Sequence, residues 1–173
     1  MEIFPVVTGS NLLGNEIEIP MELHGSLNIL VIAYQRWQQS LVDSWVPYLK
    51  KLTNEIPDVD YYELPTIRRM NWLSRSFINN GMKAGIPSGD TRGRTITLYI
   101  DKEEFNRALD VTSEDTIHIF LVDLKGQIHW RGEGSFNEQI AMQLKQAIEE
   151  ELAHRENEKS LSLSDSNNGE SQN

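Results

Sequence analysis

The sequence predicts an α/β fold in which one domain contains a mixed β-sheet with helices on both faces. Two observations carry this prediction. Apolar segments typical of strands alternate with segments of helical periodicity along most of the 173 residues, as in strands joined by crossover helices. Near the end of the chain, two strand-like segments are separated by only a short turn, which indicates an antiparallel hairpin, and an amphipathic helix follows it.

The first third of the chain predicts a lead-in, a central strand and a helix. Residues 4–23 form the lead-in, which includes a short alternating segment typical of an edge strand or hairpin. Residues 27–34 are almost continuously apolar, as in a parallel strand covered on both faces. Residues 38–54 carry one apolar stripe, and Pro47 inside this segment predicts a kinked helix. The stripe consists of Leu41, Val42, Trp45, Val46, Leu49 and Leu52.

The middle of the chain continues the alternation. A second strand is predicted at residues 59–64, ending at Pro65, and a helix at residues 66–81. Residues 81–94 are rich in glycine and proline and predict a loop. The alternating residues 94–100 then predict a third strand.

The last part of the chain predicts a short helix, a hairpin and a long helix. Asp101 is placed to cap a helix at residues 102–109. The hairpin joins residues 116–122 to residues 127–132, and residues 136–153 form the closing helix. Residues 1–155 are therefore one domain.

Residues 156–173 form an acidic tail rich in serine and asparagine. Such a composition buries too little apolar surface to offset the entropy lost on ordering. We therefore expect this tail to be disordered.

Composition excludes several classes of function. The chain has no cysteine, which excludes disulfides, thiolate metal sites and iron–sulfur clusters, and we expect no metal or cofactor. A net charge of −10 argues against nucleic-acid binding. No apolar run reaches the roughly 20 residues that a membrane-spanning helix needs. The acidic N-terminus lacks the features of a signal peptide, so we expect a cytoplasmic location.

The charge is unevenly distributed. Between residues 65 and 99 there are six basic residues and one acidic residue. This basic middle fits an acidic protein partner or a phosphate group. The alternative is that the arginines only decorate a solvated helix and loop, or contact the acidic parts of the same chain.

Three stretches of the sequence resemble the thioredoxin-like superfamily, in its peroxiredoxin and thiol-reductase branches. They are the opening at residues 4–19, the strand, linker and helix at residues 28–49, and the hairpin at residues 120–134. The resemblance implies a thioredoxin-like three-layer fold. Counted from Pro47, it places the two redox thiols of that superfamily at Gln39 and Val42, and its cis-proline at Pro87.

Because a thiolate is the nucleophile of disulfide exchange and peroxide reduction, glutamine and valine at these positions exclude thiol-dependent peroxidase or reductase activity. A fainter resemblance, carried by the ending Val122-Asp123-x-x-Gly126-x-Ile128-x-Trp130, is to the mitochondrial assembly factors of ATP synthase. It implies a chaperone-like role.

The turn at residues 35–40 is the first candidate for a partner-binding site. It lies where ligands of open α/β sheets gather, and Arg36 and Trp37 are residue types enriched at binding hot spots. If Pro87 is the cis-proline, Arg92 and Arg94 lie close to Arg36 and complete a small basic patch. The alternative is that Trp37 packs beneath a neighbouring loop while Arg36 is only solvated.

Conventional catalytic and metal sites have little support. Ser40 and Ser44 lack a neighbouring base. By period-two counting, His118 and His129 share a face of the hairpin, and without a third ligand we expect them to be structural. The sequence thus favours a redox-inactive module that binds a protein partner, as a chaperone or assembly factor. An enzyme that uses thiol-free chemistry in the same pocket is the alternative.

Overall fold

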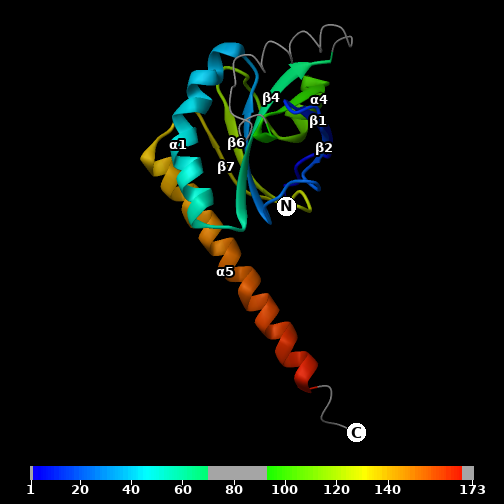
Figure 1. Ribbon diagram of the computed structural model, residues 1–173, viewed down its shortest axis with the longest axis vertical. Coiled ribbons are helices and arrows are strands. Elements are labelled where there is room, and N and C mark those ends of the chain that lie inside the picture. Colours follow the sequence, from blue (N-terminus) through cyan, green and yellow to red (C-terminus); the bar gives the residue numbers. More distant parts are fainter. Residues whose placement is uncertain (1, 70–92, 169–173) are drawn as a thin grey trace.

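The structure is a computed structural model that describes residues 2–69 and 93–168, and its centre is a seven-stranded sheet (Figure 1). In chain order, the elements are β1 (Val7–Asn11), β2 (Glu16–Ile19), β3 (Leu27–Ala33), the 3₁₀ turn η1 (Arg36–Gln38), α1 (Gln39–Glu55), β4 (Val59–Arg68), β5 (Ile96–Ile100), α4 (Lys102–Ala108), β6 (His118–Asp123), β7 (Ile128–Glu133) and α5 (Glu138–Asn168).

The strands lie in the order β2-β1-β5-β4-β3-β6-β7. The three central strands β5, β4 and β3 are parallel, whereas the β1–β2 and β6–β7 pairs at the two edges are antiparallel. This arrangement confirms the predicted mixed sheet and its C-terminal hairpin. It also shows that the lead-in forms a hairpin of β1 and β2, which is one of the two alternatives that the sequence indicated.

The two faces of the sheet bury two separate cores because β3 alternates between them. Leu30 and Ile32 pack with α4 and the N-terminal segment, while Ile29 and Val31 pack with α1 and α5. Figure 1 shows these layers, with α1 and α5 on one side of the sheet and α4 on the other. The structure therefore has the three layers that the sequence predicted.

Helix α1 buries the face that its periodicity indicated. Val42, Trp45, Leu49 and Leu52 are at most 2% exposed, and Pro47 lies inside the helix. The indole Nε1 of Trp45 donates a hydrogen bond to the carbonyl oxygen of Gly134 over 2.9 Å, so the helix is tied to the segment that leads into α5.

Strand β4 is longer than predicted, because it runs through Pro65 to Arg68. Residues 66–68 pair with Leu98–Ile100 of β5, so their assignment to a helix was wrong. Proline is tolerated here because pairing with β3 ends at Pro65 and pairing with β5 begins at the next residue. The rest of the predicted helix, and the predicted loop up to residue 92, lie outside the described residues.

A β-bulge separates the two histidines of the hairpin. Leu121 pairs with Trp130 and Val122 pairs with Ile128, which leaves His129 as an extra residue in β7. His129 consequently faces Glu151 of α5 at 3.2 Å, whereas His118 packs on the ring of Tyr34 on the other face. The prediction that they share a face was wrong because period-two counting fails at a bulge.

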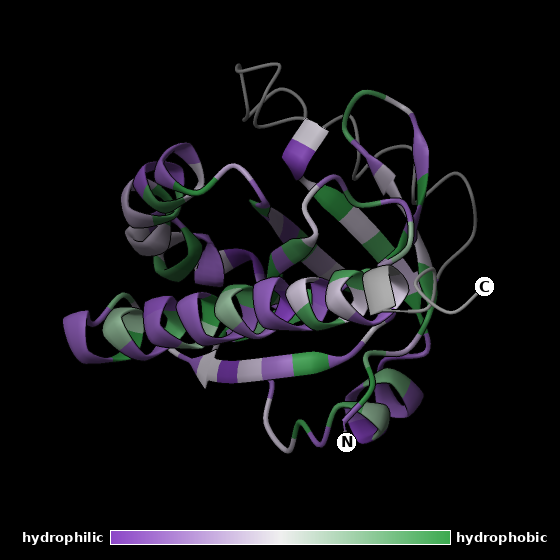
Figure 2. Ribbon diagram, turned by 90° about the horizontal axis from the view of Figure 1, so that it is seen from below, coloured by the Kyte–Doolittle hydropathy of each residue, from purple (hydrophilic) through white to green (hydrophobic). Residues whose placement is uncertain are grey.

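Helix α5 continues to Asn168, although disorder was predicted from residue 156. Every residue from 156 to 166 is exposed, and Figure 1 shows this part of the helix projecting from the domain. Once a helix is nucleated by packed turns, each further residue adds a hydrogen bond, which a composition argument does not include. Figure 2 shows hydrophilic and hydrophobic residues interleaved along α5. Within the described ranges, no helix has both the length and the apolar character needed to cross a membrane.

Removal of residues 156–173 tests how far the domain depends on this projecting helix. We expect the free energy of unfolding in urea to change by less than about 0.5 kcal/mol, because exposed residues contribute little. As the control, Leu144→Ala, in a fully buried position of the same helix, is expected to cost about 3 kcal/mol. A truncation that destabilises the domain as much as Leu144→Ala would contradict this assignment of the boundary.

Candidate functional site

The candidate site is the surface at the carboxyl end of β3, where η1 leads into α1. Arg36 is exposed and Trp37 is 59% exposed, while the next residue, Gln38, is completely buried. The prediction that this turn presents a cationic and an aromatic side chain is therefore consistent with the structure. The alternative, in which Trp37 packs beneath a neighbouring loop, does not fit its exposure.

The buried side chain of Gln38 holds this turn in place. Its Oε1 accepts hydrogen bonds from the backbone amides of Tyr34 at 2.8 Å and Gln35 at 3.2 Å. Its Nε2 donates to the carbonyl oxygen of Glu114 at 2.6 Å. One amide side chain thus ends β3, shapes η1 and joins both to the loop before β6. The sequence did not single out Gln38, because only burial distinguishes it from the neighbouring glutamines.

A second polar network closes the other face of the sheet at the same end. The hydroxyl of Tyr34 donates to Asn106 Oδ1 at 2.7 Å, and Asn106 Nδ2 donates to Glu114 Oε1 at 2.8 Å. The ammonium group of Lys102 lies 2.5 Å from the other oxygen of Glu114. Burial, assisted by the charge of Glu114, raises the pKa of Tyr34. These side chains therefore bond to one another and support the turn from the face of the sheet that carries α4.

The two positions that would hold redox thiols lie in different environments. Gln39 is exposed in the first turn of α1, and its Nε2 donates to Asp43 Oδ1 at 2.9 Å. Val42 is 2% exposed and packs in the core beneath α1. Pro87, the predicted cis-proline, lies outside the described residues. Within them, a cis peptide bond joins Ile19 to Pro20.

A buried carboxyl group, Glu63, lies next to this site. It is 5% exposed on β4 and interacts with the side chain of Gln39. Burial raises its pKa, and the nearby Asp43 adds to this effect, while Gln39 and Lys50 act in the opposite direction. No pattern in the sequence pointed to Glu63, because a glutamate in a strand is usually expected to face solvent.

The predicted basic patch around Arg36 does not include Arg94. Arg94 pairs with Asp60 and donates to the carbonyl oxygen of Tyr61 at 3.1 Å, near the amino end of β4. Asp60 pairs with Asn28 early in β3, whereas Arg36 follows the end of that strand, about 16 Å farther along. The sequence argument failed because it inferred the position of Arg94 from Pro87. Arg92 lies outside the described residues, so its place in a patch stays a prediction.

The contacts of His129 are with other side chains of the same chain. His129 lies between two carboxylates, with Nε2 at 3.2 Å from Asp123 and Nδ1 at 3.2 Å from Glu151. Arg155 Nε lies 2.7 Å from the same Glu151. In the part of the chain that the structure describes, no group of three or more histidine, aspartate or glutamate side chains is arranged to hold a metal ion.

Comparison with protein families identifies the chain. The sequence model of a family described as ATP10 protein matches residues 2–150, well over half of the 173 residues. The chain belongs to the ATP10 protein family. This match agrees with the fainter of the two resemblances noted in the sequence. A search among curated proteins gives no match.

Solved structures confirm the thioredoxin-like fold of this ATP10 family member. An exposed lipoprotein thioredoxin from Streptococcus pneumoniae superposes with a TM-score of 0.53 at 15% identity, covering 81% of this chain and 97% of its own. The thioredoxin domain of a thiol-disulfide oxidoreductase from Bacteroides vulgatus gives 0.51 at 16% identity, covering 84% and 94%. At such low identities the likeness shows the fold alone.

Replacement of Gln38 by alanine tests whether it organises the turn. We expect Gln38→Ala to lower the free energy of unfolding by about 2 kcal/mol, because buried backbone groups of Tyr34 and Glu114 lose their partners. Gln143→Ala, at an exposed position of α5, serves as the control and is expected to change stability by less than about 0.5 kcal/mol. Equal effects of the two changes in urea unfolding would refute this role of Gln38.

Glu63 predicts a pH dependence of stability. Its pKa is raised in the folded state, so the folded protein holds a proton that the unfolded chain releases, and stability falls as pH rises from about 4.5 through the folded pKa. We expect Glu63→Gln to be more stable than the wild type at pH 7, with the difference vanishing near pH 3. Thermal unfolding between pH 3 and pH 8 measures this. A variant less stable than the wild type at pH 7 would contradict it.

Proposed function

We propose that this ATP10 family member is a redox-inactive module that binds a protein partner through the turn at Arg36 and Trp37 and acts as an assembly factor. The observation that carries the proposal is the 59% exposure of Trp37 on a turn fixed by the buried Gln38. Large aromatic side chains are usually buried, and tryptophan and arginine dominate binding hot spots.

The rigidity of the turn supports this proposal. Because Gln38 bonds to three backbone groups on two loops, the conformation that presents Trp37 is set before a partner arrives. A preorganised surface loses less conformational entropy on binding. The positive charge of Arg36 beside the indole favours a partner with an acidic side chain at this contact.

The absence of cysteine supports the redox-inactive part of the proposal. The resemblance assigns the two thiols to Gln39 and Val42, and Val42 is built into the core beneath α1. A thiol-disulfide exchange needs a thiolate. We therefore expect the purified protein to show no turnover in an insulin reduction assay.

The alternative of a thiol-free enzyme has weaker support at this site. An active site brings ionisable groups with shifted pKa values together in one cleft. Glu63 interacts with side chains of α1, whereas Tyr34 belongs to the core on the other face of the sheet. The sheet separates these two groups, so they do not converge on a common substrate position.

Replacement of Arg36 and Trp37 by alanine tests the proposed surface. The partner is first captured with the wild type from the native host and identified by mass spectrometry, and its affinity is then measured with purified proteins. We expect Arg36→Ala/Trp37→Ala to weaken binding at least about tenfold. Both side chains are exposed, so the melting temperature should be unchanged.

Met142→Ala is the matched control, because Met142 is 70% exposed on α5 and also presents apolar surface. It should leave the affinity unchanged. If the Arg36 and Trp37 double variant binds the partner as tightly as the wild type, this turn is not the binding surface.

A further inference from the structure

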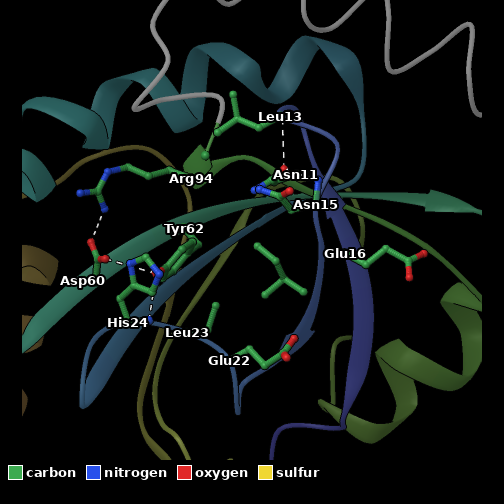
Figure 3. A pocket seen from close by; sticks show the side chains of 12 residues that line it. Asn11, Leu13, Asn15, Glu16, Glu22, Leu23, His24, Asp60, Tyr62 and Arg94 are labelled. Carbon is green, nitrogen blue, oxygen red and sulfur yellow. Dashed lines mark hydrogen bonds and ion pairs between the residues drawn. The ribbon is translucent and has the colours of Figure 1, made fainter.

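A cavity of about 500 Å³ opens near the amino end of β4, away from the turn of Trp37 (Figure 3). Its walls are the β1–β2 hairpin, residues 22–24, the first part of β4 and residues 93–94. This volume lies within the range of known ligand sites. Leu13, Ile17 and Leu23 supply apolar surface, and the remaining lining side chains are mainly polar.

Asn11 aims a hydrogen-bond donor into this cavity. Its side-chain Oδ1 accepts from the backbone amides of Leu13 at 3.0 Å and Asn15 at 2.9 Å, which fixes the orientation of the amide group. Asn11 is 5% exposed, yet its Nδ2 has no hydrogen-bond partner among the described residues. No fully buried side-chain nitrogen or oxygen in the described part of the chain lacks a partner, so this Nδ2 keeps some accessible surface, and Asn11 lines the cavity. It can therefore receive an acceptor atom from a ligand.

The charges around the cavity leave an excess of negative charge. On one side, Asp60 is paired with Arg94, and it also accepts from the hydroxyl of Tyr62 at 3.2 Å. Glu16 and Glu22 lie on the other side in Figure 3. Glu22 accepts from the backbone amide of Glu18 at 2.7 Å, which fixes its position without neutralising it. A ligand for this cavity thus needs an acceptor for Asn11 and positive charge for the two glutamates.

We propose that this cavity binds a basic polypeptide segment of a partner protein. A backbone carbonyl oxygen of the segment accepts from Asn11 Nδ2, and a lysine or arginine side chain faces Glu16 and Glu22. The methylene stem of that side chain packs on the apolar wall, because lysine and arginine bury their stems along apolar surface while the charged group stays in water. Phosphates and nucleic acids are repelled by the same glutamates.

This site is separate from the proposed contact at Arg36 and Trp37. That contact favours acidic groups at the carboxyl end of β3, whereas the cavity favours basic groups near the amino end of β4. The two ends of the sheet therefore recognise opposite charge.

The test is a ¹H–¹⁵N NMR titration of the full chain with the tripeptide acetyl-Ala-Lys-Ala-amide. We expect a saturable shift of the Asn11 side-chain NH₂ resonances. The variant Asn11→Asp assigns these resonances, because it loses the NH₂ group but keeps the oxygen Oδ1. The peptide with norleucine in place of lysine lacks the charge, and n-butylammonium lacks the carbonyl acceptor. Each is expected to bind at least about tenfold more weakly.

Charge variants complete the test. Glu16→Gln/Glu22→Gln should lower the affinity for the lysine peptide about tenfold. Glu149→Gln/Glu150→Gln, which removes the same charge from α5, should leave that affinity unchanged. The proposal is overturned by non-saturable shifts, by equal binding of the norleucine peptide or of butylammonium, or by equal effects of the two double variants. None of these readouts depends on Arg36 or Trp37, so the proposed function is tested separately.

Discussion

The complete burial of β3 between two cores is the constraint on which the rest of the structure depends. Six of its seven residues are buried, and alternate side chains enter the core under α1 and α5 or the core around α4. A strand covered on both faces and paired on both edges has no exposed backbone. The chain leaves the sheet at the end of the strand, and the backbone amides that follow need hydrogen-bond partners outside the sheet.

Gln38 meets that requirement and thereby creates the candidate site. The resemblance of the sequence places the reactive cysteines of the thioredoxin-like superfamily at Gln39 and Val42, directly after this turn. Here the turn is instead held by an amide side chain that bonds to backbone groups of Tyr34, Gln35 and Glu114. The same framework holds Trp37 in an exposed position.

The two ends of the central strands differ in the charged side chains that they carry. Arg36 gives the carboxyl end of β3 a positive charge, while Glu16 and Glu22 leave the cavity near the amino end of β4 negative. The ion pair of Asp60 and Arg94 joins the first residues of β4 to the segment before β5. Contacts between residues far apart in the sequence therefore decide where the charged side chains lie. The net charge of −10 does not reveal this distribution.

The sequence by itself determined the order of the described elements from β3 onward, the buried character of β3, the stripe on α1 and the absence of cysteine. These features depend on local periodicity and on residue type, which a single chain displays directly. The tertiary structure alone decided that Gln38 is buried while Gln39 is exposed, that a bulge turns His129 to the face opposite His118, and that Arg94 lies near Asp60 rather than Arg36. Each of these depends on which distant residues meet, and no local pattern encodes that. The absence of cysteine is evident from composition, whereas the exposure of Trp37 beside the buried Gln38 required the fold.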